Sequence, residues 1–230
     1  MESQSSLEFK KLKFSYKSPA VDKKPILEID SFQIMKGEKV FLYGPSGCGK
    51  STLLNLVAGV LKPTEGSIRV LGHDFDLLSS SKKDQIRGEK IGYIFQSFNL
   101  IPYLSVKENI LLPLWMNKKE DTSKDNLGGI LKSLNIEELQ DSEVVNLSIG
   151  QQQRVAAARA LVGEPQLVIA DEPTSSLDKK NTLEFMELLL KKWEEKKFTL
   201  LFVSHDETLA DFFEKKVSLE ELNVRSGKEQ

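Results

Sequence analysis

The sequence predicts an α/β fold with a mostly parallel sheet core, an antiparallel β flank and an inserted helical subdomain. Short, continuous apolar runs alternate with helical patterns, as in parallel strands joined by crossover helices. Near the N-terminus, residues 7–16 and 26–34 instead alternate apolar and polar side chains, which favours antiparallel pairing. The segment 97–150 carries mainly helical patterns, and we interpret it as the insertion.

Five apolar runs are interpreted as buried strands. Three of them are too apolar to alternate, which suits a sheet covered on both faces. The runs are KVFLY (39–43), SIRVL (67–71), IGYIF (91–95), QLVIA (166–170) and FTLLFV (198–203). Helical periodicity is found at 50–60, 105–116, 125–135, 150–163 and 179–196.

Composition excludes several classes of protein. The 230 residues are 40% hydrophobic and 29% charged with a formal net charge of −2, so no global basic field indicates nucleic acid. The only cysteine, Cys48, rules out an intramolecular disulfide. No apolar run approaches the roughly 18 residues that span a bilayer, and the first residues lack the apolar core of a signal peptide. We therefore expect no direct membrane insertion and a cytoplasmic protein.

The segment GPSGCGKS (44–51) follows a predicted strand and precedes a predicted helix. This is the G-x-x-x-x-G-K-[ST] pattern in the context that binds phosphate. Its glycines let backbone N–H groups converge on phosphate oxygens, Lys50 can reach the β- and γ-phosphates, and the Ser51 hydroxyl can bind Mg²⁺. We predict that the nucleotide is bound by Gly44, Pro45, Ser46, Gly47, Cys48, Gly49, Lys50, Ser51 and Thr52.

Two carboxylates end the predicted strand within LVIADEPT (167–174). Open α/β sheets bind ligands at the carboxyl ends of their strands. Asp171 is therefore predicted to hold Mg²⁺, directly or through water, and Glu172 to polarise the attacking water. Alone, the pair could equally be two solvated acids at a strand end.

With these motifs in order, the chain resembles the ATP-binding cassette (ABC) ATPases over nearly its whole length. The resemblance implies a P-loop NTPase fold of the ABC type that hydrolyses ATP with Mg²⁺. It further implies that Tyr16 stacks on adenine, that Gln96 contacts Mg²⁺ and senses the γ-phosphate, and that His205 is the switch histidine. Asp178 in SSLD matches the acid of the D-loop, the segment that follows the catalytic carboxylates.

The stretch LSIGQQQR (147–154) matches the family signature. The resemblance implies that Ser148, Gly150 and Gln151 bind the nucleotide held by a second copy, so that two chains dimerise head to tail on ATP. Ile149 replaces the usual glycine. A β-branched residue would be strained at positive φ but tolerated if only its backbone matters, and we expect tolerance.

The resemblance also divides the chain, which we expect to be one domain over 1–230. Residues 1–95 and 160–230 would form the nucleotide-binding core with its β flank. Residues 96–159 would form the helical subdomain that carries the signature.

The segment IGYIFQSFNLIPYLSVKENILLPL is similar in sequence to the branch of the family that serves lipoprotein release and macrolide export. This similarity implies a partner permease in the inner membrane, with the chain peripheral on its cytoplasmic face and docked near Phe98 and Leu100. Those side chains could instead fill the subdomain core. The alternatives are an ATPase that regulates a membrane complex such as that of cell division, a soluble member of the superfamily, and a nucleotide-gated switch with little turnover.

Overall fold

The structure is a computed structural model, and it describes residues 5–16, 25–117 and 123–223. The chain forms two compact units. The first unit comprises Met1–Lys83 with Leu201–Gln230, and the second comprises Asp84–Leu200. The boundaries fall inside helix α2 (Ser80–Lys90) and strand β8 (Thr199–Ser204). The predicted subdomain limits at 95/96 and 159/160 describe a different division and stay a prediction.

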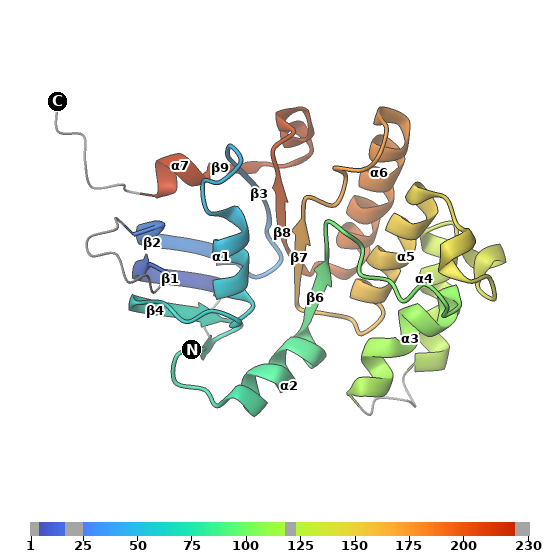
Figure 1. Cartoon of the computed structure of the whole chain (residues 1–230), viewed down its shortest axis with the longest axis horizontal. Coiled ribbons are helices and arrows are strands. Elements are labelled where there is room, and N and C mark those ends of the chain that lie inside the picture. The colour runs from blue at the N-terminus through green and yellow to red at the C-terminus, as the bar shows by residue number, and fades with distance from the viewer. Residues whose placement is uncertain (1–4, 17–24, 118–122, 224–230) are drawn as a thin grey trace. The chain divides into compact units, whose positions relative to one another are not determined.

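An antiparallel sheet forms the flank of the first unit (Figure 1). Its order is β2 (Leu27–Met35), β1 (Ser5–Phe14), β4 (Glu65–Val70) and β5 (His73–Asp74). Phe9 of β1 lies opposite Phe32 on one side and Ile68 on the other. Leu7, Phe9, Leu12 and Phe14 are buried, so β1 places its apolar residues in the core. The predicted antiparallel flank is confirmed, and the run 67–71 belongs to it.

The first unit also contains parallel strands. β3 (Lys39–Tyr43) pairs in parallel with β9 (Lys215–Ser218), and Val40, Phe41 and Leu42 are fully buried. The Phe41 ring lies 6.0 Å from that of Phe202 in β8 and 5.4 Å from that of Phe213. Helix α1 (Lys50–Val57) follows β3. A 3-10 helix (Glu207–Phe212) follows β8, and the short helix α7 (Leu219–Leu222) follows β9.

The second unit pairs β6 (Ile91–Ile94) in parallel with β7 (Leu167–Asp171). Helix α5 (Ile149–Leu161) packs against α3 (Val106–Met116) and α4 (Ser123–Ser133), and α6 (Lys179–Lys196) contacts α5. Residues Val155–Ala158 of α5 are all buried, because small side chains let neighbouring helices approach closely. Two short 3-10 helices, Glu137–Leu139 and Val144–Asn146, precede α5.

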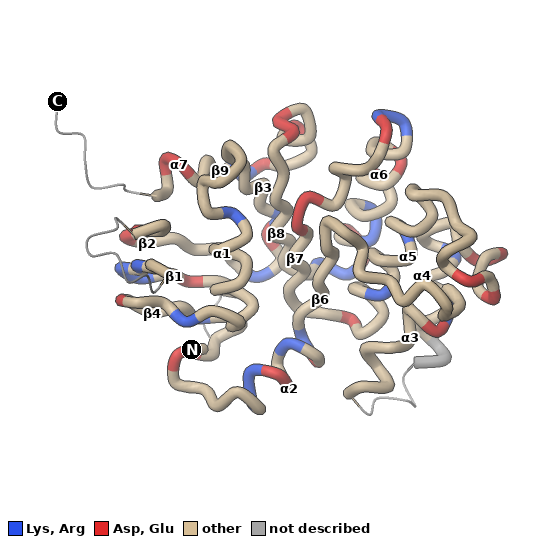
Figure 2. The backbone as a smooth tube through the Cα atoms, in the orientation of Figure 1, with Lys and Arg blue, Asp and Glu red and all other residues tan. Residues whose placement is uncertain are grey.

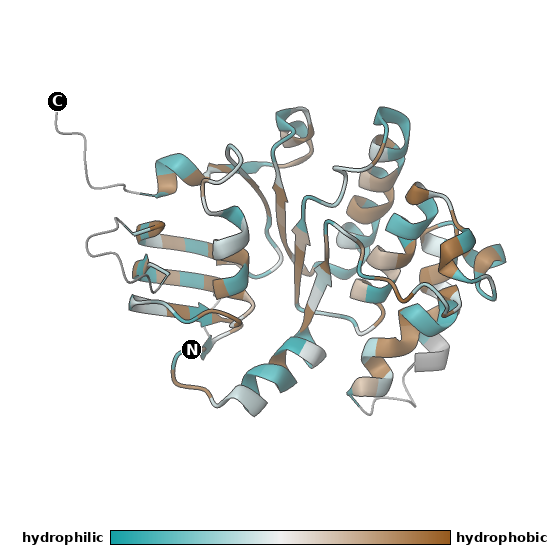
Figure 3. Ribbon diagram, in the orientation of Figure 1, coloured by the Kyte–Doolittle hydropathy of each residue, from teal (hydrophilic) through white to brown (hydrophobic). Residues whose placement is uncertain are grey.

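Most predicted elements agree with the structure to within a few residues, but α2 was not predicted. Its sequence SSKKDQIRGEK is almost entirely polar, and only Ile86 is buried. Figure 3 shows α2 as mainly hydrophilic, whereas the strands β7 and β8 are themselves mainly hydrophobic. A helix with one buried residue leaves no apolar stripe for a periodicity argument to detect.

Charged residues of both signs are distributed over both units (Figure 2). Across the ranges that the structure describes, none of the helices combines the length and apolar character needed to cross a bilayer.

Candidate nucleotide-binding site

The phosphate-binding segment lies between β3 and α1, as predicted. Gly47 has φ 80° and Gly49, the N-cap of α1, has φ 107°, a left-handed backbone that glycine adopts readily. Gly44 is needed for space instead, because a Cβ there would lie 2.8 Å from Cys48 Sγ. Three glycines therefore shape one loop for two different physical reasons.

The loop presents polar groups at its surface. Pro45, Ser46, Gly47 and Ser51 are exposed, whereas Cys48 is buried. The Lys50 ammonium donates hydrogen bonds to the Gly44 carbonyl at 2.7 Å and the Pro45 carbonyl at 3.1 Å. Accessible backbone N–H groups at a helix N-terminus beside an ammonium are suited to a polyphosphate.

Two further predicted residues lie in the first unit. The Tyr16 ring is 53% exposed and packs edge-on against Phe14 at 4.9 Å. Its hydroxyl lies 3.3 Å from Thr52 Oγ1 in the first turn of α1, so the exposed aromatic stands beside the phosphate-binding segment. His205 is exposed and directly follows β8.

In the second unit, two carboxylates end strand β7. Glu172 is buried, with 8% of its surface exposed, and its φ of 47° is left-handed. Non-glycine residues rarely adopt this conformation, and such strain collects at functional sites. Asp171 accepts a hydrogen bond from the Tyr93 hydroxyl at 3.4 Å. Burial and then the charge of Asp171 raise the pKa of Tyr93 well above its usual value.

Gln96 is exposed in the loop after β6, and a left-handed turn follows it. The turn consists of Phe98 with φ 58° and Asn99 with φ 50°. The guanidinium of Arg159 in α5 donates hydrogen bonds to both of their carbonyls. Burial lowers the pKa of Arg159. The turn is thus held by a helix some 60 residues away in the sequence.

A fully buried amide fixes the next part of this loop. Asn109 of α3 accepts from the Ile101 backbone N–H at 2.8 Å. Its side-chain N–H groups are directed at the carbonyls of Ile101, Leu104 and Ser105. Four backbone groups of the loop are therefore held by one side chain.

The signature segment forms the N-terminus of α5. Ser148 is the N-cap: its hydroxyl accepts from the Gln151 backbone N–H at 3.3 Å, and Gln151 Oε1 accepts from the Ser148 N–H at 2.9 Å. This reciprocal pair is a capping box. Ile149 is the first helical residue, and its side chain is 53% exposed. Its φ is not positive, so the backbone gives no reason for strain at this substitution.

Asp178 caps α6 close to the signature. Its carboxylate accepts from the Asn181 backbone N–H and side-chain amide, both at 2.8 Å. These bonds, the backbone one first, lower the pKa of Asp178. A Cβ on Gly150 would lie 3.0 Å from Asn181 Oδ1, so any residue other than glycine requires the Asn181 side chain to shift slightly. The Asn181 side chain thus binds the D-loop acid and occupies the space next to the signature glycine.

The structure therefore groups the predicted residues on the two units. The first unit carries Tyr16, the phosphate-binding segment, Thr52 and His205. The second carries Gln96, Ser148, Gly150, Gln151, Asp171, Glu172 and Asp178. The Ser51 hydroxyl of the first unit is exposed, and the second unit carries the Asp171 carboxylate; each is an oxygen donor of the kind that Mg²⁺ prefers.

Sequence reasoning missed four residues that hold the site: Tyr93, Asn109, Arg159 and Asn181. Their partners are distant in the sequence, except for the local partners of Asn109 and Asn181. The sequence did contain one usable signal, because Ser148 followed three residues later by Gln151 is the capping-box spacing.

The fold and the phosphate-binding segment together define a P-loop nucleotide-binding protein. Comparison with known proteins gives the family: the model described as "ABC transporter" matches residues 27–175. The chain belongs to this family and is an ABC-type ATPase.

Relatives include the lipoprotein-releasing system ATP-binding protein LolD of Buchnera aphidicola. It is 44% identical over 177 residues, which are 76% of this chain and 77% of LolD. The macrolide export ATP-binding/permease protein MacB of Syntrophobacter fumaroxidans is 36% identical over 89% of this chain, but the match spans only 29% of MacB. These relatives place the chain in the LolD/MacB-like branch.

Solved structures agree. The dimeric structure of MJ0796, an ABC transporter cassette, superposes with a TM-score of 0.80 at 36% identity, covering 92% of this chain and 93% of that one. The relatives found by sequence include a protein also named MJ0796, from Methanocaldococcus jannaschii. A second MJ0796 structure is a dimeric post-hydrolysis state bound to ADP and Pi, with a TM-score of 0.79.

Proposed function

We propose that this ATPase hydrolyses ATP with Mg²⁺ in a head-to-tail homodimer and thereby drives a partner permease of the lipoprotein-release or macrolide-export type. The observation that carries the proposal is Glu172, a buried carboxylate in strained backbone directly after Asp171 at the end of β7. A residue with a purely structural role could sit in unstrained backbone at a lower cost in folding free energy, so the strain favours a functional role.

Each predicted residue has a role in this proposal. The phosphate-binding segment with Lys50 holds the β- and γ-phosphates, and Tyr16 stacks on the adenine. Ser51, Gln96 and Asp171 hold magnesium, which supplies charge neutralisation for the phosphoryl group when bound. Glu172 orients and polarises the attacking water, and His205 stabilises the charge that develops on the γ-phosphate.

Ser148, Gly150, Gln151 and Asp178 complete the site of the second copy. Their exposure supports this role for Ser148 and Asp178, both of which lie at capped helix N-termini. To bind a γ-phosphate, the Ser148 hydroxyl keeps its lone pair on the Gln151 N–H and donates its own proton outward. Strain at Ile149 would favour the alternative of a switch with little turnover, but Ile149 is helical and not at positive φ, so its backbone does not support that alternative.

The permease is proposed to dock beside Phe98 and Leu100. Both side chains are half-buried, and Tyr103 nearby is 75% exposed. A pocket next to this turn is lined by Phe95, Pro113, Leu114 and Arg159. An exposed apolar surface beside a concave one is typical of a partner site. Through this contact the chain would be peripheral on the cytoplasmic face of the inner membrane.

The test compares the wild type with Glu172→Gln in the presence of ATP and Mg²⁺, following phosphate release and molecular mass. The substitution keeps shape and removes the carboxylate, so we expect hydrolysis to fall by about 100-fold or more. With ATP trapped, the variant should form a stable dimer.

Lys50→Ala in the Glu172→Gln background is the control, and it should stay monomeric because its affinity for the phosphates is lost. Wild-type hydrolysis by Glu172→Gln would overturn the role of Glu172. A Glu172→Gln chain that binds ATP yet remains monomeric would overturn dimerisation of this chain by itself.

A further inference from the structure

Strand register brings Tyr93 to Asp171. In the parallel pair of β6 and β7, Tyr93 lies opposite Ile169. Asp171 is two residues beyond Ile169, and side chains two apart share one face of a sheet. The Tyr93 hydroxyl consequently reaches Asp171 Oδ2 at 3.4 Å. Phenylalanine at position 93 would pack alike but would offer no donor.

The Tyr93 ring is held in place. It stacks on Phe95 with the ring centroids 4.2 Å apart and the planes at 26°. A tyrosine hydroxyl has one proton to donate, and here it is directed at the carboxylate.

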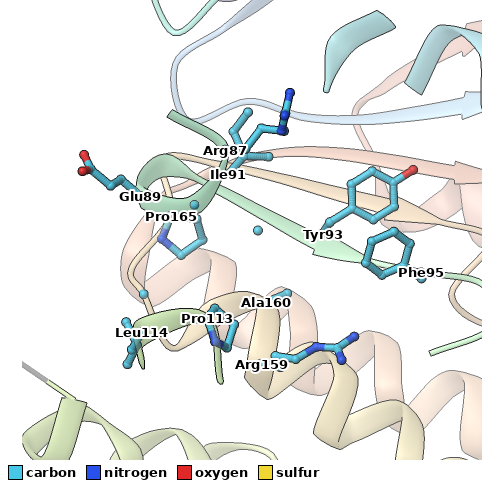
Figure 4. Close-up of a pocket in the computed structure, with 13 residues that line it drawn as sticks. Arg87, Glu89, Ile91, Tyr93, Phe95, Pro113, Leu114, Arg159, Ala160 and Pro165 are labelled. Carbon is cyan, nitrogen blue, oxygen red and sulfur yellow. The ribbon is translucent and has the colours of Figure 1, made fainter. Parts of the chain in front are cut away.

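The same ring lines a pocket of about 180 Å³ (Figure 4). Phe95 lies beside Tyr93, and Pro113 with Leu114 of α3 and Arg159 of α5 line other parts of the pocket. All of these residues belong to the second unit. Tyr93 thus has one side on the pocket and its polar end on the carboxylate that follows β7.

We propose that Tyr93 is a positioning residue that orients the Asp171 carboxylate for magnesium. The inference rests on the proposed function, in which Asp171 holds the metal. A donor on Oδ2 restricts the rotation of the carboxylate and so sets the direction in which it faces the metal or a metal-bound water. Partners that orient a metal ligand in this way alter metal affinity without touching the metal.

The test measures binding of ATP by calorimetry with excess MgCl₂ and again with EDTA, for the wild type and Tyr93→Phe. The substitution removes one oxygen atom and keeps the ring. We expect the magnesium-dependent gain in ATP affinity to fall about three- to tenfold, at or below the lower limit for such partners because the hydrogen bond is long. Affinity in EDTA should stay unchanged. Mn²⁺ binding followed by electron paramagnetic resonance should weaken in parallel.

Tyr43→Phe is the matched control, because Tyr43 ends another strand and its ring stacks near Phe41. It should leave the magnesium-dependent gain at the wild-type value. In Asp171→Asn the gain should be lost, and adding Tyr93→Phe should then cause no further change, since the hydroxyl acts only through Asp171.

Two failures can be told apart. A wild-type gain in Tyr93→Phe, with the gain lost in Asp171→Asn, would overturn the positioning role alone. A wild-type gain in Asp171→Asn would overturn the assignment of Asp171 in the proposed function. Thermal unfolding of each variant shows whether it is folded, and an unfolded Tyr93→Phe would contradict the inference, because a positioning hydroxyl is dispensable for folding.

Discussion

Two regions of the molecule use left-handed backbone, but with different residues. The phosphate-binding segment uses Gly47 and Gly49. The segments that follow β6 and β7 in the second unit use Phe98, Asn99 and Glu172, with φ between 47° and 58°. Glycine adopts this conformation at no steric cost, whereas other residues lose about 1–2 kcal/mol each. The first region is therefore shaped by its own sequence, and the second needs support from elsewhere.

That support is visible for the turn after Gln96. Arg159 donates to the carbonyls of Phe98 and Asn99, and Asn109 holds the following loop. For Glu172, the Ser175 N–H donates to its carbonyl at 3.2 Å and closes a turn. The difference teaches that the residues assigned to phosphate binding are preset locally. The turn after Gln96 depends instead on side chains of two helices, Arg159 of α5 and Asn109 of α3.

The largest expected effect is on the glycine side of the comparison. Gly49→Ala places a Cβ 2.9 Å from Leu27 Cδ2 at a φ of 107°. Backbone strain and this close contact should together lower the free energy of unfolding by about 3 kcal/mol. Urea unfolding followed by circular dichroism measures it, and ATP affinity should fall as well.

Gly47→Ala is the control, because its φ is also positive but no atom lies within 4 Å of the added Cβ. Only the backbone cost remains, so the loss should be about 1 kcal/mol. Equal losses for the two variants would show that space around Gly49 does not matter.

A somewhat smaller effect is expected on the supported side. Arg159→Ala leaves the carbonyls of Phe98 and Asn99 without their charged donor, and the loss in unfolding free energy should be about 2 kcal/mol. Arg159→Lys keeps the charge but lacks the planar fork that serves two acceptors, so it should recover only part of this loss. Full recovery by Lys, or wild-type stability in the Ala variant, would contradict the role of the fork.

The contrast also explains what the sequence could predict. The phosphate-binding segment was found because spacing, glycines and flanking strand and helix are all local. The apolar strands were found for the same reason. Arg159 looks like any arginine in a helix, and Tyr93 like any strand aromatic, because their partners become neighbours only after folding. The strain at Glu172 is likewise invisible in LVIADEPT.

The signature is an intermediate case. The sequence led to a role for Ser148 toward the nucleotide of a second copy, which stays a proposal. The spacing of Ser148 and Gln151 also predicts a capping box, and the structure contains one. One hydroxyl can thus serve the helix through a lone pair and a phosphate through its proton, so neither interpretation excludes the other.

The smallest expected effect isolates the strain at Glu172. Glu172→Gly and Glu172→Ala both remove the carboxylate, and both should abolish hydrolysis. They differ only in how well the new residue tolerates a φ of 47°. Glycine should therefore give a chain that is more stable than the alanine variant by about 1 kcal/mol, measured by thermal and urea unfolding.

The control is the same Ala-to-Gly change within a helix. At Ala157 of α5 it should lower stability instead. An alanine variant as stable as the glycine variant would mean that the backbone after Asp171 relaxes once the carboxylate is gone. The positive φ at position 172 would then be imposed by the interactions of the carboxylate and not by the fold of the turn.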